Sequence, residues 1–432
     1  MNWISQAAFL IIIAITGYFL TRRINRIRQN ILSGKDLDRS ENKKERFKTM
    51  LLVAFGQGKM FKKPIPAFLH LLIYVGFLVI NIEVLEFVID GLAGTHRIFA
   101  SFLGSFYTVA LNFFEFLAVL VTFSCIAFLV RRNVLKVERL VKPEMKGWPA
   151  LDANLILIIE ITLMMAILKM NAADQILQSR GVEGYTETGS FFFSSLFIPI
   201  LTHFETPFLI FVERASWWFH IIGILGFAVY VTYSKHLHIF LAFPNTYYSN
   251  LWNKGKIKNM DDVTNEVKMM LGVAEETGAP PAEISRFGAK DATDLTWKSL
   301  MESYTCTECG RCTSECPANQ TGKLLSPRKI MMDTRDRIEE IGKGEGKDKT
   351  LLGDYITKEE INACTSCNAC TEACPVNIDP LSIILEMRRY VSMEESGSPA
   401  SWNSMFSNIE TNFAPWKFAP SDRFKWKEEL NK

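Results

Sequence analysis

Eight of the nine cysteines fall in two short motifs of identical spacing. The first motif reads CTECGRCTSECP and the second CTSCNACTEACP, and both fit the pattern C-x2-C-x2-C-x3-C-P. Three closely spaced thiolates can bind one face of a cubane [4Fe–4S] cluster, and the fourth thiol, followed by proline, reaches the neighbouring cluster. The motifs therefore predict two clusters. Their ligands are Cys306, Cys309, Cys312 and Cys374 for the first, and Cys364, Cys367, Cys370 and Cys316 for the second.

Zinc is the alternative reading of such motifs. Structural zinc sites use four ligands, commonly in two CxxC pairs, and a triplet followed by Cys-Pro, occurring twice, does not fit that pattern. In a chain of this length, regular tight spacing also indicates metal binding rather than disulfides, and hence a reducing compartment. The ninth cysteine, Cys125, lies alone in an apolar segment and is interpreted as a small core residue.

Apolar residues are concentrated in the first half of the 432-residue chain. The chain is 48% hydrophobic and 22% charged, with a formal net charge of +2. Segments of about 20 apolar residues can span a bilayer. Five such segments are predicted to do so, at about 3–20, 65–89, 105–130, 151–170 and 216–241. Basic residues cluster beside these segments rather than in an aromatic-rich patch, which favours lipid and excludes nucleic acid as a partner.

The basic loops predict the orientation in the membrane. The loops after the first and third segments, TRRINRIRQN and RRNVLKVERLVKPEMK, are expected in the cytoplasm, which leaves the N-terminus outside. A further apolar stretch at 191–212 is interrupted by Pro199 and Pro207. Because iron–sulfur clusters need the reducing side, we expect five spans and a cytoplasmic cysteine domain. The 191–212 stretch is then an outer-surface helix or hairpin, and the first span is a retained anchor.

The predicted fold is mainly α. A five-helix transmembrane haem b domain (1–241) precedes a linker (242–300) and an α-helical two-[4Fe–4S] ferredoxin-type domain (301–392). A tail over 393–432 has no strong periodicity but contains several aromatic residues, such as Trp402 and Trp416. We interpret this tail as a partner-docking segment, the alternative being that its aromatics pack on the domain itself.

Histidines within and beside the apolar segments suggest haem. His220 and His238 are 18 residues apart, which on one helix places them on the same face about 27 Å apart. Two stacked b-type haems would need this arrangement. His70, near the cytoplasmic start of the second segment, is the predicted partner of His238. For His220 the candidates are His96 and His203, of which His96 is favoured. The plainer reading is a buried histidine bonded to a neighbouring helix.

Carboxyl groups also occur inside the apolar segments. Glu83 and Glu86 lie toward the outer end of the second segment, and Glu115 and Glu160 lie in the third and fourth. The simplest role for such groups is hydrogen bonding between helices. The functional alternative is proton handling at a quinone site, because quinone reduction takes up protons. Glu83 and Glu86 are the candidates for quinone-linked proton transfer.

Several stretches resemble known redox proteins. HIIGILGFAVYVTYSKHLHIF is similar to the last span of the haem b gamma subunit of respiratory nitrate reductase, including the histidine spacing, and the membrane half also resembles the E subunit of heterodisulfide reductase. FGAKDATDLTW, YTCTECGRCTSECPANQTGK and SPRK look like the C subunit of heterodisulfide reductase. The fused arrangement resembles membrane Fe–S oxidoreductases that pass electrons between electron-transferring flavoprotein, or a similar donor, and menaquinone.

The resemblance implies an oxidoreductase subunit in the bacterial inner membrane. It would pass electrons between a cytoplasmic donor and menaquinone through two [4Fe–4S] clusters and one or two haems b. Two features depart from the pattern. Ile80 stands where the gamma subunit has a second histidine, and the chain lacks the Cys–Cys pair of a CCG domain, so a CCG-domain iron–sulfur protein would be a separate subunit. The alternative function is an electron-transfer anchor for a heterodisulfide-reductase-like partner, with no quinone site of its own.

Overall fold

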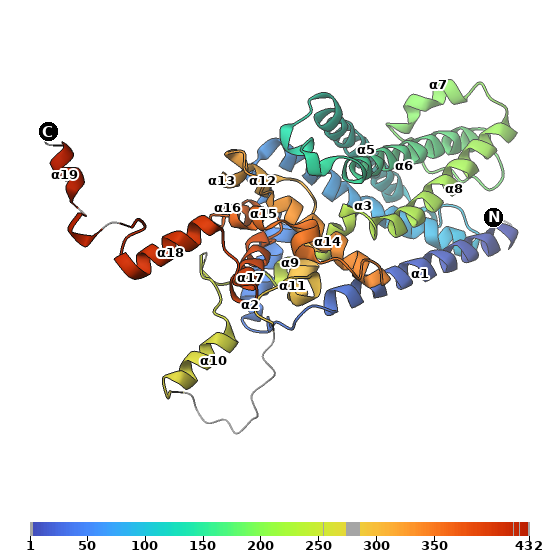
Figure 1. Ribbon diagram of the computed structural model, residues 1–432. Coiled ribbons are helices and arrows are strands. Elements are labelled where there is room, and N and C mark those ends of the chain that lie inside the picture. The colour runs from blue at the N-terminus through green and yellow to red at the C-terminus, as the bar shows by residue number, and fades with distance from the viewer. Residues whose placement is uncertain (1–2, 254, 274–285, 418, 423, 431–432) are drawn as a thin grey trace.

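Five long helices form the first half of the molecule (Figure 1). The computed structural model describes residues 3–253, 255–273, 286–417, 419–422 and 424–430. Within these ranges, the helices long and apolar enough to cross a membrane are five, as predicted. They are α1 (Trp3–Leu32), α3 (Pro64–Ala93), α5 (Ser105–Leu129), α6 (Trp148–Ser179) and α8 (Thr206–Val231). The described residues contain no β-strand, only two isolated bridges, so the predicted all-helical character is confirmed.

The fifth long helix differs from its predicted bounds. α8 begins at Thr206, where Pro207 fits the first turn of a helix, and it ends at Val231 rather than continuing to residue 241. The backbone then turns, and the Ser234 hydroxyl accepts a hydrogen bond from the His236 amide, which starts a short 3-10 turn over Lys235–Leu237. A new helix, α9 (His238–Tyr247), follows. His220 and His238 therefore lie on different helices.

The stretch at 191–212 divides between two elements. Residues Ser194–Phe197 form a 3-10 turn that continues into the short helix α7 (Ile198–Leu201), and residues from Thr206 onward belong to α8. Only the first part is therefore a short surface element of the expected kind.

Close helix contacts hold the five-helix bundle together. α3 packs on α5, α5 on α6 and α6 on α8. At the α3–α5 crossing, a Cβ atom added to Gly76 would collide with Cγ2 of Val121. Glycine at this position therefore sets the separation of the two helices.

The second half of the chain forms a compact helical domain, here called the cysteine domain, on one end of the bundle (Figure 1). Its helices are α11 (Trp297–Thr305), α12 (Arg311–Ser314), α13 (Pro317–Gln320), α14 (Pro327–Lys343), α15 (Lys358–Asn362), α16 (Ala369–Ala373) and α17 (Pro380–Met393). Side chains cap several of them at the N-terminus: Thr296 accepts from the Ser299 amide, and Thr357 forms a capping box with Glu360.

One hydrophobic core joins the two halves. It contains Ile27 of α1 and Leu237 beside α9 together with the apolar residues of the cysteine domain. Ala289 and Leu295, which the sequence placed in the linker 242–300, also lie in this core. The cysteine domain therefore begins before the predicted residue 301, because the segment ahead of α11 packs against α17 and α14.

Four further helices lie outside the five-helix bundle and the cysteine domain. α2 (Lys43–Met50) packs against α9. α10 (Asp261–Met270) lies apart from the body, and α18 (Ala400–Asn412) and α19 (Lys425–Leu430) extend away from the cysteine domain (Figure 1). α18 carries exposed apolar side chains, including Trp402, Phe406 and Ile409.

The two ends of the bundle are chemically distinct. Helices α3 and α6 begin beside the cysteine domain, and helices α1, α5 and α8 end beside it. Contacts such as Arg23–Glu339 and Arg139–Cys309 require this arrangement. The loops 94–104 and 180–205 lie at the opposite end, here called the distal end. The two ends can therefore host different sites.

Replacing Gly76 with leucine should force α3 and α5 apart. Overpacking a filled core costs about 1–3 kcal/mol, so we expect a lower melting temperature of the detergent-purified protein, followed by tryptophan fluorescence. Gly17→Leu on α1 is the matched control, because a Cβ at Gly17 meets nothing within 4 Å. Equal melting temperatures for the two variants would contradict this account of the helix contact.

Candidate iron–sulfur and histidine sites

Four thiols from both cysteine motifs line one cavity. They are Cys306, Cys309, Cys312 and Cys374, here called the first cysteine set. Cys306 directly follows α11, Cys312 lies in α12, and Cys374 follows α16. Met331, Val376 and Ile378 supply apolar walls. Within the described residues, no group of three or more His, Cys, Asp or Glu side chains is arranged to hold a single metal ion.

The other four thiols form the second cysteine set: Cys316, Cys364, Cys367 and Cys370. Cys316 belongs to the first motif, yet burial and then the Cys364 and Cys367 thiolates raise its pKa. Likewise burial, followed by Asp379 and Cys364, raises the pKa of Cys370 to about 12. Each motif therefore contributes three thiols to one set and one thiol to the other, which is the exchange that the sequence predicts.

The donor chemistry of the first cysteine set fits an iron cluster. Burial raises the pKa of Cys306 to about 12, although the backbone hydrogen bond from Glu308 lowers it. Burial and then Cys309 raise the pKa of Cys374 to about 12 as well. Without a positive partner such thiols stay protonated at neutral pH. Iron binds the thiolate form, so its charge would displace these protons.

The two motifs share one backbone conformation. Glu308 and Gly310 in the first motif have φ of 53° and 71°, and the equivalent Ser366 and Asn368 have φ of 55° and 61°. Glycine and asparagine tolerate this left-handed region best. At Gly310 a Cβ atom would also lie 2.5 Å from Nη1 of Arg328. The repeated sequence thus wraps each triplet of thiols in the same way.

Backbone amides point at the sulfurs. The Ser366 amide donates to Sγ of Cys364 at 3.4 Å, and the Ile378 amide donates to Sγ of Cys374 at 3.3 Å. Hydrogen bonds of this kind tune the reduction potential of a bound cluster.

Loops at the ends of the membrane helices hold the first motif. Arg139, after α5, donates to the carbonyl of Cys309 at 2.6 Å, and Arg311 donates to the carbonyl of Met60, just before α3, at 3.2 Å. The Lys235 ammonium lies 2.5 Å from the buried Glu308 carboxylate. The first cysteine set therefore faces the bundle.

One thiol of the second cysteine set is exposed to solvent. Cys367 is the exposed thiol among the nine cysteines, whereas Cys306, Cys316, Cys370 and Cys374 are buried. An exposed thiol marks the face of the domain from which a soluble partner can come closest to the second cysteine set.

His70 and His238 lie together where the bundle meets the cysteine domain. Their ring centroids are 6.4 Å apart, with the planes inclined by 40°. Nδ1 of His70 is 3.1 Å from the Gln57 side-chain oxygen, and Nδ1 of His238 donates to the Lys235 carbonyl at 3.0 Å. Both Nε2 atoms therefore remain for a ligand, with Nδ1 fixed as in known metal sites. Two imidazoles on one metal, at about 2 Å per bond, have centres about 6 Å apart.

His236 joins this group of rings. Its ring centroid is 5.4 Å from that of His238, and its Nδ1 is buried with no hydrogen-bond partner in the described part of the chain. The sequence assigned this residue no ligand role.

His220 lies deep in the bundle on α8. Its Nδ1 donates to the Leu163 carbonyl at 3.1 Å, and its ring packs on Phe87 at 5.6 Å. Its Nε2 is buried and has no hydrogen-bond partner among the residues that the structure describes. A buried imidazole with one nitrogen anchored and the other free has the donor set of an axial haem ligand.

The structure does not bring the favoured partner to His220. Nε2 of His96 lies 3.5 Å from Asp174 and 3.8 Å from Glu213, and no contact between described residues joins His96 to His220. His203, the other candidate, is exposed near the start of α8.

Glu83 and Glu86 are both buried in the distal half of α3. The Glu86 carboxylate accepts hydrogen bonds from the Phe99 amide at 2.9 Å and from the Tyr107 hydroxyl at 2.7 Å. Phe87, next to Glu86, touches both His220 and Trp217. The two glutamates thus lie in the part of the bundle that contains His220.

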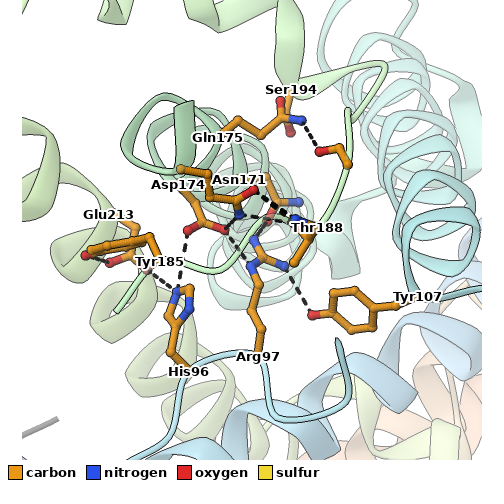
Figure 2. Close-up of polar contacts among 12 residues, drawn as sticks. His96, Arg97, Tyr107, Asn171, Asp174, Gln175, Tyr185, Thr188, Ser194 and Glu213 are labelled. Atoms are coloured by element: carbon orange, nitrogen blue, oxygen red, sulfur yellow. Dashed lines mark hydrogen bonds and ion pairs between the residues drawn. The ribbon is translucent and has the colours of Figure 1, made fainter. Parts of the chain in front are cut away.

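Sequence reasoning missed the polar residues that surround these glutamates. Arg97, Asn171 and Asp174 form a buried network at the distal end (Figure 2). The sequence did contain a signal for these residues, because placing an ionisable residue inside or beside an apolar segment costs free energy and therefore indicates a role. Asp174 was overlooked because it lies beyond the predicted end of the fourth span at residue 170, whereas α6 continues to Ser179.

Comparisons with known proteins agree with the cysteine chemistry. Residues 302–378 match the family model described as a 4Fe-4S dicluster domain. The chain aligns with the probable iron-sulfur-binding oxidoreductase FadF of Bacillus subtilis (strain 168) at 27% identity. The alignment includes 98% of this chain and 60% of that protein. It aligns with the EtfAB:quinone oxidoreductase of Syntrophomonas wolfei at 25% identity, and this alignment includes 92% of this chain and 56% of that protein.

A shorter match covers 22% of the chain. The chain is 33% identical over 95 residues to the C subunit of a CoB-CoM heterodisulfide reductase of Methanosarcina acetivorans, covering 49% of it. No solved structure matches the chain. The chain thus spans a little more than half the length of the first two relatives, and its relatives are iron–sulfur oxidoreductases. The prediction of a two-cluster iron–sulfur domain is confirmed by the family match.

Exchange of the fourth cysteine between the sets can be tested by substitution. Cys316→Ser should damage the second cluster, although Cys316 lies in the first motif, because its thiol lies with Cys364 and Cys367. We expect its electron paramagnetic resonance spectrum after reduction to match that of Cys367→Ser, with iron content lowered to a similar degree. Cys309→Ser is the reference for damage to the first cluster. A Cys316→Ser spectrum that matches Cys309→Ser would contradict the exchange.

Proposed function

We propose that this chain is the electron-transferring membrane subunit of an oxidoreductase, and that it passes electrons between a partner at the cysteine domain and menaquinone in the bilayer. The observation that carries the proposal is the direct contact between the two candidate redox sites. Glu308, between Cys306 and Cys309, pairs with Lys235, whose carbonyl holds the His238 ring. When bound, the two [4Fe–4S] clusters and haem b supply one-electron carriers.

The residues at this contact hold the two sites in place. Burial lowers the pKa of His238, and burial together with the neighbouring His238 lowers that of His236 well below its ordinary value. Both imidazoles therefore stay neutral, the form in which histidine binds a metal. His70 and His238 are the proposed axial pair for the haem near the cysteine domain, and His220 is a proposed ligand deeper in the bundle.

The exposed Cys367 side of the second cysteine set is the proposed docking point for the partner. Cys367 is exposed there, and the aromatic face of α18 emerges beyond the end of α17. One relative carries the name EtfAB:quinone oxidoreductase. We therefore infer that an electron-transferring flavoprotein, a CCG-domain iron–sulfur subunit or both dock on this face, with α18 contributing to the contact.

The distal half of the bundle is the proposed quinone end. Quinone reduction needs proton donors beside an electron donor. Glu83 and Glu86 are buried one helical turn apart, and Phe87, next to Glu86, packs on the His220 ring. In this proposal the two carboxyl groups exchange protons with the quinone, and lipid-facing side chains of α3 and α5 admit its tail.

A second function has one observation in its favour. The Glu86 carboxylate is already hydrogen-bonded by the Phe99 amide and the Tyr107 hydroxyl, as expected for a carboxyl group that only ties helices together. On this reading the chain is an electron-transfer anchor for a heterodisulfide-reductase-like partner and does not react with quinone itself.

Substitution of His238 tests the proposed haem site. His238→Ala should remove a low-spin b haem from the reduced-minus-oxidised spectrum while the iron–sulfur signals remain, because the cysteines are untouched. His203→Ala, at an exposed histidine, is the control and should leave the spectrum unchanged. Full retention of haem in His238→Ala, or the absence of any haem band in the unaltered protein, would contradict the assignment.

The two functions differ in their reaction with quinone. If the proposed function is correct, dithionite-reduced protein should reduce a menaquinone analogue in lipid nanodiscs. Glu83→Gln should slow that reaction about tenfold or more, since a positioned proton donor typically contributes about 10²–10⁴ in rate. Haem-containing protein that transfers electrons to ferricyanide but not to the quinone analogue would favour the anchor function instead.

A further inference from the structure

A dense network of ionisable groups occupies the distal end of the bundle (Figure 2). Arg97 lies at its centre: its guanidinium donates to Asp174 at 2.5 Å, to Asn171 at 2.7 Å and to the Tyr107 hydroxyl at 3.3 Å. Tyr107 in turn donates to Glu86. The network therefore links α6, where Asp174 lies, to the glutamates of α3.

The network contains more buried carboxyl groups than arginines that bind them. Six carboxyl groups with at most 5% of the residue exposed gather here: Glu83, Glu86, Asp90, Glu115, Asp174 and Glu213. The guanidinium groups bonded to them are those of Arg97 and Arg214. A buried charge without a partner costs several kcal/mol. Charge balance therefore requires that the network holds protons, which the groups share as a coupled system.

His96 lies at the edge of the network. Its Nε2 faces Asp174 at 3.5 Å and Glu213 at 3.8 Å, and 20% of its side chain is exposed, against 0% for Asp174 and 2% for Glu213. Its ring packs on Tyr185 of the loop 180–205, with centroids 5.0 Å apart. His96 is thus a titratable group placed between solvent and the buried acids.

Two atoms at this edge are left without hydrogen bonds. Oδ1 of Asp174 and Nδ1 of His96 are buried and have no such partner within the described ranges. Oδ2 of Asp174, by contrast, accepts from Arg97 and Gln178, and Glu213 is bound by Arg214 and Tyr185. Asp174 Oδ1 is therefore the open acceptor that His96 faces.

We propose that His96 passes protons between the aqueous phase at the distal end and the buried carboxyl network, with Asp174 as the first acceptor. This inference rests on the proposed function, because it supplies the protons for quinone reduction. It assigns His96 a role in proton transfer rather than as a haem ligand.

The step balances in atoms and charge. When water reaches the partly exposed ring of His96, a proton binds its unpartnered Nδ1, the Nε2 proton passes to Oδ1 of Asp174, and the imidazole returns to its neutral form. No electron moves in this step. Imidazole suits it because it takes up and releases protons near neutral pH.

Arg97 couples the protonation of Asp174 to Glu86 and keeps its own proton. Burial alone would lower the pKa of Arg97, but Asp174 beside it holds that pKa well above the ordinary value. Once Asp174 is protonated, the guanidinium charge is freed to stabilise an ionised Glu86 through Tyr107. One proton entering at Asp174 thus favours the release of one proton at Glu86, and the charge of the network is unchanged.

The experiment uses the full chain with its cofactors in proteoliposomes that contain a menaquinone analogue. Dithionite added outside reduces only molecules whose cysteine domain faces outward, so the distal end faces the lumen. We expect the rate of quinone reduction to follow the lumenal pH. His96→Asn should lower the rate about tenfold and remove that pH dependence, while Glu183→Gln, at an exposed acid of the loop 180–205, behaves as the unaltered protein. Imidazole enclosed in the lumen should restore the rate of His96→Ala at least severalfold.

A second measurement does not need quinone. On reduction, the purified protein should take up protons, followed with a pH indicator dye by stopped flow, and His96→Asn should slow that uptake about tenfold. Slow uptake in this variant together with an unaltered protein that never reduces quinone would support the inference and overturn the proposed function.

The contrary outcomes are equally distinct. Unchanged uptake and an unchanged pH profile in His96→Asn would overturn the inference and leave the quinone function standing. Loss of a haem band in His96→Asn would also overturn it, because His96 would then be an axial ligand.

Discussion

The buried ion pair between Lys235 and Glu308 is the contact on which the arrangement of the molecule depends. Glu308 lies between Cys306 and Cys309, and Lys235 lies three residues before His238. Arg335 binds the other oxygen of the same carboxylate at 2.8 Å. Such a pair adds little net stability, but removing one partner leaves a buried charge and typically costs about 3–5 kcal/mol. The first cysteine set and the His70–His238 pair therefore hold a fixed separation.

The same contact gives the molecule two unlike ends. Beside the cysteine domain, the loops of the membrane helices present arginine and lysine to the carbonyls and the carboxylate of the first motif. At the distal end, the helices bury carboxyl groups around Arg97. A redox protein that joins electron carriers to proton chemistry needs both kinds of site, kept apart by an apolar stretch. The bundle core between them, around Ile80, Leu117 and Val121, supplies that separation.

The break after α8 shows that two histidines can lie together although one premise about their helix was wrong. The 18-residue spacing of His220 and His238 placed both on one helix face, and His70 was matched to His238 by depth. The helix in fact ends at Val231. The Ser234 cap and the 3-10 turn then place the ring centroid of His238 6.4 Å from that of His70. The expected depth of His238 in the membrane depends on its distance along the chain from the ends of the spans, and the break hardly changes it. The helix face on which His238 lies depends on a continuous helix, which the break removes.

Local features were settled by the amino-acid sequence alone. Two cysteine motifs of fixed spacing define an iron–sulfur domain, and five apolar segments become five long helices, because spacing and hydropathy act over a few residues. Which distant groups meet depends on how the helices pack. The tertiary structure packed Ala289 and Leu295 into the cysteine domain, moved His96 away from His220 to Asp174 and Glu213, and assembled the network around Arg97. Those outcomes depend on contacts between residues far apart in the chain, and no local pattern encodes them.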